Sequence, residues 1–341
     1  MISNGKFYES QFEEATIELL REAHWQYAFG DDIHRKYTDP LIEEDLRNFL
    51  TVQYKDKNLT TSEMDSIVAN LRNTGGQNDY YALRNAFLLY RDGYDFAYSD
   101  GRDNPFRLEY IDFEHPDHNI FRCVNQFVME QGRENRRPDI LLFINGIPVC
   151  IIELKNPTKQ NATIHDAHTQ ICTRYMRDIP ALLKYCALAV ISDGAKNALG
   201  TTYTPFEFFY EWKKIENEDK AGKGLDTLRT LIRGALSPER ILEILRDYVY
   251  FPDPTKEDDT TEIVCRYPQF FATRKLRDHI LNHLRSVGGD GKGGTYFGAT
   301  GCGKTYTMLF LARQLALRCR KQQPGRSLQK ATIRAWRIIQ E

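Results

Sequence analysis

The first hundred residues carry apolar positions at helical spacing. Residues 9–29 form an amphipathic pattern that predicts one helix, and its apolar side consists of Phe12, Ala15, Ile17, Leu19 and Leu20. Similar patterns predict helices at residues 41–50, 61–72 and 79–92. Thr60 precedes the second of these three helices and is an N-cap residue type.

From Arg107 onward, short apolar runs alternate with turn residues, which is typical of strands. The predicted strands are residues 108–113, 121–127, 139–144, 149–155 and 186–192. Helical patterns return at residues 165–176 and 225–250, with a charged loop at 216–224 before the second. This order predicts an α/β fold, a mixed sheet flanked by helices.

Length and composition place the chain among globular proteins of two domains. It has 341 residues, of which 41% are hydrophobic and 27% charged. We predict a first domain at residues 1–250, a linker at 251–261 rich in Pro, Asp and Lys, and a second domain at 262–341. No apolar run reaches 18 residues and the start of the chain is polar, so we expect a cytoplasmic protein without membrane contact.

Charge and cysteine content change this picture little. The net charge of −1 neither indicates nor excludes nucleic acid as a partner. Seven scattered cysteines without a C-x-x-C pair predict reduced thiols. Histidine pairs occur at 115/118, 165/168 and 279/283, but no Cys or carboxylate pattern completes a metal site, so we expect surface or loop histidines.

The stretch RRPDILLFINGIPVCIIELKNP, residues 136–157, holds the most informative chemistry. Asp139 opens one strand, and Glu153 and Lys155 share one face at the end of the next. Charged residues on an otherwise apolar strand are costly unless they are paired or hold an ion. Two carboxylates can bind Mg²⁺, and a nearby ammonium can stabilise charge that develops on a phosphate. A structural Asp beside an ordinary Glu–Lys pair is the alternative.

The Asn145-Gly146 dipeptide between the two strands predicts a hairpin turn. A regular two-residue loop pairs Ile144 with Ile147, and therefore Asp139 with Ile152, which turns Asp139 away from Glu153. We therefore predict a three-residue loop or a β-bulge near one strand end.

These residues resemble the PD-(D/E)xK nuclease core. More narrowly, residues 107–157, including HPDHNIFRCVNQF at 115–127, resemble the restriction subunits of type I restriction-modification enzymes. The resemblance implies a restriction-endonuclease-like fold, with Asp139 and Glu153 as metal ligands and Lys155 as the catalytic lysine. One of Glu13 or Glu14 would assist them, and the sequence does not choose between the two.

The same family carries a Gln and a Tyr, spaced Q-x-x-x-Y, on a helix after the nuclease core. The candidates here are Gln170 and Tyr175, which lie one residue further apart. Five residues along an α-helix rotate a side chain by about 140° from the starting face. Gln170 is therefore the better candidate, and Tyr175 has the alternative of packing against the sheet together with Ile171.

Residues 298–305, GATGCGKT, fit the phosphate-binding loop pattern G-x-x-x-x-G-K-[ST]. A short strand at 295–297 and a helix at 305–317 would complete its context. The residues expected to bind ATP and Mg²⁺ are Gly298, Gly301, Gly303, Lys304 and Thr305. Upstream, residues 266–276 resemble the adenine-reading segment that precedes the phosphate-binding loop in the helicase group to which type I restriction subunits belong, and Gln269 would contact the base.

The second domain is expected to be a partial RecA-like lobe. The 36 residues after Thr305 contain no acidic D-E-x-x motif, so we expect an incomplete motor and no ATPase activity from this chain. The resemblance implies a DNA-cleaving, Mg²⁺-dependent type I site-specific deoxyribonuclease. Its cofactors would be Mg²⁺ and ATP, and its partners double-stranded DNA and the methylation and specificity subunits. The alternatives are a repair or recombination nuclease–helicase and a non-catalytic module that binds DNA or partner subunits.

Overall fold

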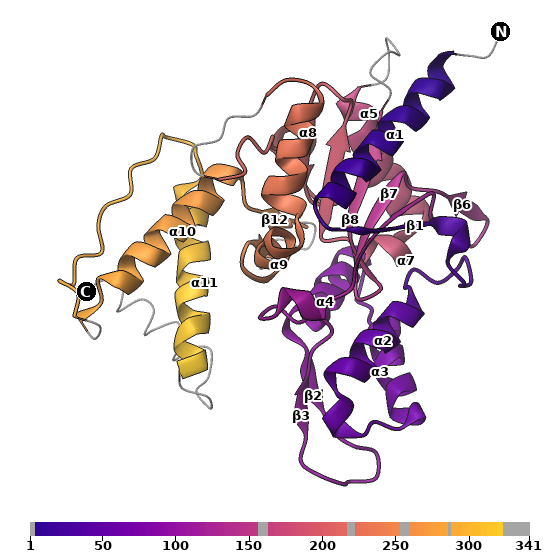
Figure 1. Cartoon of the computed structure of the whole chain (residues 1–341), viewed down its shortest axis with the longest axis horizontal. Helices are drawn as coiled ribbons and strands as arrows, with labels where there is room; N and C mark the ends of the chain where they lie inside the picture. Colours follow the sequence, from indigo (N-terminus) through magenta and orange to yellow (C-terminus); the bar gives the residue numbers. More distant parts are fainter. Residues whose placement is uncertain (1–3, 156–162, 217–221, 253–259, 286–287, 323–341) are drawn as a thin grey trace. The chain divides into compact units, whose positions relative to one another are not determined.

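The computed structural model of the chain describes residues 4–155, 163–216, 222–252, 260–285 and 288–322 (Figure 1). Two compact units make up the chain, Met1–Val264 and Cys265–Glu341. Most of the predicted linker, residues 253–259, lies outside the described residues.

A six-stranded mixed sheet forms the centre of the first unit, in the order β1-β4-β7-β8-β9-β10. The neighbouring pairs β1/β4 and β8/β9 are parallel, and the remaining pairs are antiparallel. The strands are β1 Gln26–Phe29, β4 Phe121–Asn125, β7 Ile140–Ile144, β8 Ile147–Leu154, β9 Leu188–Ser192 and β10 Asn197–Gly200. The predicted mixed α/β sheet is therefore confirmed.

Three small two-stranded sheets accompany the central one. They are β2 Tyr94–Phe96 with β3 Phe106–Leu108, β5 Met129–Gln131 with β6 Glu134–Arg136, and β11 Val249–Tyr250 with β12 Ile263–Val264.

Helices surround the sheet, and Figure 1 shows α1 and α5 near one end of the first unit, with α2 and α3 toward the other. Their bounds are α1 Asn4–Glu22, α2 Glu43–Gln53, α3 Thr61–Asn73, α4 Asp79–Asp92, α5 Ile164–Thr169, α6 Met176–Asp178, α7 Pro180–Leu183, α8 Leu225–Leu231 and α9 Pro238–Asp247. Thr60 caps α3 in a capping box with Glu63, as its residue type predicts.

Both faces of the central strands are buried, which explains their continuous apolar runs. On one face, Leu141, Ile151 and Ile191 pack with Ile171 and Tyr175 from the segment after α5. This face also carries Glu153, because Ile151 and Glu153 lie two positions apart on β8.

Several predicted boundaries are wrong. The helix predicted at 9–29 ends at Glu22, and its last four residues form β1, because parallel pairing with β4 overrides the local helical pattern. Of the strand predicted at 108–113, only Leu108 lies in a strand, as the last residue of β3. The helix predicted at 225–250 contains a π-helical turn at Ile232–Leu236, and its final residues pair as β11.

The second unit holds α10, Tyr267–Asn282, and α11, Lys304–Gln322. Ile280 packs with Leu311, Leu315 and Ala316 in an apolar core between these helices. The strand predicted at residues 295–297 is wrong, because this segment is irregular. No strand occurs among the described residues of this unit, so the RecA-like lobe remains a prediction.

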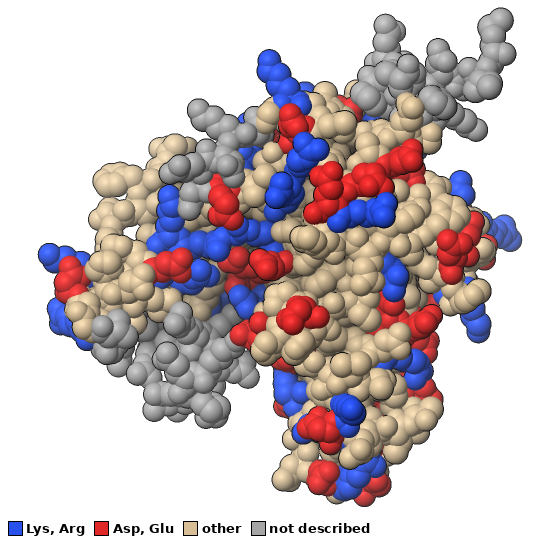
Figure 2. Space-filling model, in the orientation of Figure 1, with Lys and Arg blue, Asp and Glu red and all other residues tan. Residues whose placement is uncertain are grey.

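Surface charge and cysteine state are those of an ordinary globular chain. On the face shown in Figure 2, acidic and basic side chains are interspersed over both units. The six cysteines whose side chains are described are free thiols, as predicted. Among the described residues, no helix is both long enough and apolar enough to cross a bilayer.

Candidate functional site

A β-bulge in the hairpin of β7 and β8 brings Asp139 to Glu153. The turn is the tight two-residue loop, with positive φ at Asn145 (50°) and Gly146 (76°). Pairing shifts by one residue between Leu142 and Phe143, so Ile140 lies opposite Ile152. Continuing this register places Asp139 opposite Glu153, on the same face of the sheet. The predicted bulge near a strand end is confirmed: Val149 of β8 is the extra residue, between Pro148 opposite Phe143 and Cys150 opposite Leu142, close to the turn.

Asp139 is fixed at this position by the neighbouring backbone. Its Oδ2 accepts a 2.7 Å hydrogen bond from the backbone N–H of Leu154. Its carbonyl accepts a 3.2 Å bond from the N–H of Gln126, which follows β4. The ends of β4, β7 and β8 therefore meet at Asp139.

Glu153 belongs to a closed ring of four side chains. Lys155 Nζ donates to Glu153 Oε1 and to Gln170 Oε1, both at 2.7 Å. Gln170 Nε2 donates to the Tyr175 hydroxyl at 2.7 Å, and this hydroxyl donates to Glu153 Oε2 at 3.3 Å. The predicted residues Glu153, Lys155, Gln170 and Tyr175 thus form the ring, and Asp139 lies opposite Glu153.

A π-helical turn explains why Tyr175 reaches the ring. Residues Gln170–Tyr175 form this turn between α5 and α6. A π-helix bonds residue i to i+5, so its turn brings residues five apart onto one face. The prediction that Tyr175 rotates away from Gln170 is wrong, because these residues form a π-helical and not an α-helical turn. Tyr175 also packs against the sheet beside Ile171, as its alternative predicted.

The environment of Glu153 opposes its ionisation. Its side chain is 1% exposed. Burial, and next to it the negative charge of Asp139, raise the pKa of Glu153 to about 8, although Lys155 acts in the opposite direction. Burial and the charge of Glu153 also raise the pKa of Tyr175.

The donor set fits a hard divalent cation. Two carboxylates that face each other repel, and a cation between them removes that repulsion. All of the donor atoms that Asp139 and Glu153 offer are oxygens, which Mg²⁺ prefers. The residues present therefore suit the ion that the sequence predicts.

The structure favours Glu13 over Glu14 as the assisting acid. Glu13 Oε1 accepts hydrogen bonds from Asn125 Nδ2 at 2.7 Å and Gln126 Nε2 at 3.0 Å. Because Gln126 also bonds to Asp139, Glu13 is linked to the same strand ends. Glu14 is exposed. The sequence offered no signal for this choice, since the contact joins residues more than 100 positions apart.

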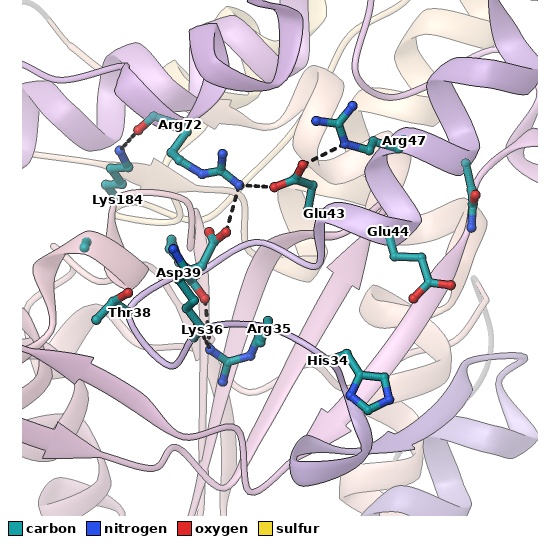
Figure 3. A pocket seen from close by; sticks show the side chains of 13 residues that line it. His34, Arg35, Lys36, Thr38, Asp39, Glu43, Glu44, Arg47, Arg72 and Lys184 are labelled. Carbon is teal, nitrogen blue, oxygen red and sulfur yellow. Dashed lines mark hydrogen bonds and ion pairs between the residues drawn. The ribbon is translucent and has the colours of Figure 1, made fainter. Parts of the chain in front are cut away.

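A separate cavity of about 820 Å³ contains none of the predicted nuclease residues (Figure 3). Charged side chains around it pair with one another: Arg72 contacts Asp39 at 2.7 Å and Glu43 at 2.6 Å, and Arg47 contacts Glu43 at 2.7 Å. We assign no function to this cavity.

The second unit brings the predicted nucleotide-binding residues together. Lys304 begins α11, and its Nζ donates to the carbonyls of Gly298 and Ala299 at 3.0 Å. Gln269 Nε2 donates to the Gly303 carbonyl at 3.3 Å. Gly301 and Gly303 both have positive φ, which other residue types rarely adopt. Thr305 is exposed in the first turn of α11.

Comparison with known proteins identifies the family. Residues 6–208 match the model of the type I restriction enzyme R protein N terminus. The chain is 28% identical over 319 residues to the HindI type I restriction enzyme endonuclease subunit of Haemophilus influenzae, covering 90% of this chain and 30% of that protein.

Two further type I restriction enzyme endonuclease subunits are similar. One, from Staphylococcus saprophyticus, is 24% identical over 77% of this chain and 26% of its own length. Another, from Escherichia coli, is 27% identical over 57% of this chain and 59% of its own length. The chain spans under a third of the Haemophilus relative, and the matched region includes the whole Asp139–Glu153–Lys155 site. The chain therefore belongs to the family of type I restriction enzyme R proteins, matching its N-terminal region.

Proposed function

We propose that this chain cleaves DNA by Mg²⁺-dependent hydrolysis of a phosphodiester bond. The observation that carries the proposal is the pair of carboxylates Asp139 and Glu153 at adjacent strand ends. Glu153 is also hydrogen-bonded to Lys155 and Tyr175, and Gln170 bridges those two side chains. This arrangement would supply a cation site beside the ammonium group of Lys155.

Asp139 and Glu153 would hold the Mg²⁺ ion. When bound, the ion would polarise the phosphate and lower the pKa of a coordinated water. Lys155 would stabilise negative charge that develops on the phosphoryl oxygens, because its Nζ lies 2.7 Å from Glu153 Oε1.

Gln170 and Tyr175 would act as positioning residues. Gln170 accepts a hydrogen bond from Lys155 and donates one to Tyr175, so it fixes the direction of the ammonium group. Tyr175 donates to the oxygen of Glu153 that Lys155 does not contact. Together they would hold both catalytic side chains in one rotamer, which reduces the reorganisation needed for reaction.

We propose that the second unit binds ATP through Gly298, Gly301, Gly303, Lys304 and Thr305, with Gln269 reading the base. In the complete enzyme, ATP-driven translocation would supply DNA to the nuclease, and methylation and specificity subunits would select the site. The family and the relatives' names as endonuclease subunits support the nuclease assignment, whereas the ATP site rests on the G-x-x-x-x-G-K-T loop itself.

Cleavage of supercoiled plasmid by the purified chain, with Mg²⁺ or Mn²⁺, tests the nuclease proposal. The parent should nick or linearise the plasmid, whereas Asp139→Ala and Lys155→Ala should lose at least about a hundredfold in rate. Lys184→Ala, a change of the same type in a lysine that bonds to the carbonyls of Arg72 and Thr74, is the matched control. If the parent chain binds the metal but does not cleave the plasmid, the nuclease proposal is wrong for this chain, and the alternative of a non-catalytic binding module is favoured.

A further inference from the structure

A second cluster of side chains that could hold a metal ion lies near the turn between β7 and β8. Asp112, His115 and His118 each place one potential ligand atom within 4.8 Å of the others. Asp112 Oδ2 lies 3.3 Å from His115 Nδ1 and 3.0 Å from His118 Nδ1. The sequence pattern D-x-x-H-x-x-H marks this cluster, and the expectation that no carboxylate accompanies the histidine pairs is wrong here.

Local geometry aligns the two imidazoles. Pro116–His118 form a 3₁₀ helix, in which three residues make one turn, so side chains three apart lie above one another. The rings of His115 and His118 are stacked, with centroids 4.8 Å apart and planes 24° from parallel. Both therefore present Nδ1 to the same carboxylate.

Asp112 is held in place by a network that leaves one of its oxygens facing the rings. Its Oδ1 accepts hydrogen bonds from the backbone N–H groups of Glu114 and His115, at 2.9 and 3.0 Å. Asn119 bonds to both backbone groups of Asp112 through its side-chain amide. Such outer contacts fix the direction of a ligand before an ion binds.

We propose that Asp112, His115 and His118 form a binding site for Zn²⁺ or a similar transition-metal ion. Two imidazoles and a carboxylate are ligands that suit zinc, whereas Mg²⁺ prefers oxygen alone. Tetrahedral coordination at about 2.1 Å separates ligand atoms by about 3.4 Å, close to both Asp–His distances. Solvent would supply the remaining ligand, since the histidine side chains are 63% and 49% exposed.

This site is separate from the nuclease site. Asn119 Oδ1 accepts from Asn145 Nδ2 at 2.8 Å, which places the cluster near the hairpin turn. Asp139 and Glu153 lie at the opposite ends of the two strands that this turn joins, roughly 20 Å away at about 3.3 Å per residue.

An ion here would stabilise the fold around residues 112–119. Gln53, at the end of α2, donates to Asp112 Oδ2 at 3.3 Å. Arg246 of α9 donates to the carbonyl of Phe113 and to Glu114, both at 3.3 Å. The cluster thus lies where segments distant in sequence meet, and binding to the folded chain alone would raise its stability.

Zn²⁺ titration against a chromophoric chelator tests the proposal. Every protein in the comparison carries Asp139→Ala, so that the nuclease site contributes little to the signal. The His115→Gln/His118→Gln double variant is compared with the matched His165→Gln/His168→Gln variant. The matched pair has the same spacing on α5, but its rings are 6.3 Å apart and His168 bonds to the Thr204 carbonyl.

The proposal predicts at least about tenfold weaker Zn²⁺ binding for the 115/118 variant and no change for the 165/168 variant. Zn²⁺ should also raise the Tm of the background protein and of the matched variant, but not that of the 115/118 variant. Equal Zn²⁺ affinity in all three proteins, equal loss in both double variants, or no binding by the background protein would overturn it. None of these results bears on Mn²⁺ binding at Asp139, so the nuclease proposal is tested independently.

Discussion

Gln170 donates a 2.7 Å hydrogen bond to the Tyr175 hydroxyl across a π-helical turn. A π-turn contains one residue more than an α-turn, so the extra residue is absorbed locally and the helices on either side keep their faces. The family's Q-x-x-x-Y spacing would place the same two side chains together on an ordinary α-helix. The five-residue spacing of Gln170 and Tyr175 on a π-turn would therefore allow the same Gln–Tyr contact as the four-residue family spacing on an α-helix.

Deleting exposed Thr173 should convert the π-turn to an α-turn and preserve both fold and metal binding. We expect the free energy of unfolding to change by no more than about 1 kcal/mol, measured by chemical denaturation. The matched deletion is Ser66, exposed in the regular helix α3, where one missing residue rotates buried Ile67 and Val68 off the core. That deletion should cost more than about 3 kcal/mol. Equal losses from both deletions would contradict the π-turn explanation.

Glu13→Ala should weaken Mn²⁺ binding, and Glu14→Ala should not. Glu13 bonds to Asn125 and Gln126 beside Asp139, whereas Glu14 is exposed. Because Glu13 acts on the ends of these strands, we expect a decrease of about tenfold in affinity, measured by calorimetry. The two variants remove the same group one position apart, so equal affinities would exclude a role for Glu13.

Mn²⁺ affinity should rise with pH up to about 8. The pKa of Glu153 is raised to about 8, so below that pH a proton competes with the ion for the carboxylate. The apparent affinity should increase about tenfold per pH unit below 8 and level off above it. Calorimetry in buffers from about pH 6 to pH 9 measures this profile. A flat profile would show that Glu153 is ionised at neutral pH without metal.

The same raised pKa predicts how metal-free stability depends on pH. Folded Glu153 stays protonated up to about pH 8, whereas in the unfolded chain this carboxyl has its ordinary pKa of 4.5. The folded state then binds more protons, so this group's contribution to stability falls as pH rises between these values, by up to about 1.4 kcal/mol per unit. Glu153→Gln should remove that slope in EDTA. Denaturation of both proteins at several pH values checks this, and identical slopes would count against a buried neutral Glu153.

Lys304→Ala should weaken binding of a fluorescent ATP analogue at least about tenfold, because Lys304 begins α11 beside the glycine loop. Lys275→Ala, which changes an exposed lysine of α10, is the control and should bind as the parent does. Neither protein should show DNA-stimulated ATP hydrolysis. Robust turnover by the parent would contradict the prediction that this chain does not hydrolyse ATP.

The sequence predicted the central hairpin well, because short apolar runs on either side of an Asn-Gly turn are local signals. The candidates Gln170 and Tyr175 came instead from the resemblance to the family. The need for a bulge also followed from the sequence, since only one register brings Asp139 to Glu153. The π-turn could not be predicted from the sequence, because the residues around Gln170 fit the pattern of an α-helix equally well. Strand β1 was missed for a similar reason: its pairing with β4 joins residues almost 100 positions apart.

Side-chain contacts over long sequence separations were beyond prediction. Nothing local distinguishes Glu13 from Glu14, because the contact of Glu13 with Asn125 joins residues more than 100 positions apart. Asn119 is only seven positions from Asp112, but their contact depends on how the loop before β4 folds. The D-x-x-H-x-x-H spacing was visible, but only the 3₁₀ turn shows that its three side chains converge.

Mn²⁺ binding by calorimetry, with the parent and Asp139→Ala side by side, tests the central claim most directly. Mn²⁺ suits sites built from oxygen ligands and can replace Mg²⁺ in them. Asp65→Ala, which removes an exposed carboxylate of α3, controls for nonspecific loss of charge. We predict binding by the parent and by Asp65→Ala, and its loss in Asp139→Ala. Equal binding by all three proteins, or none by the parent, would contradict a metal site at Asp139 and Glu153.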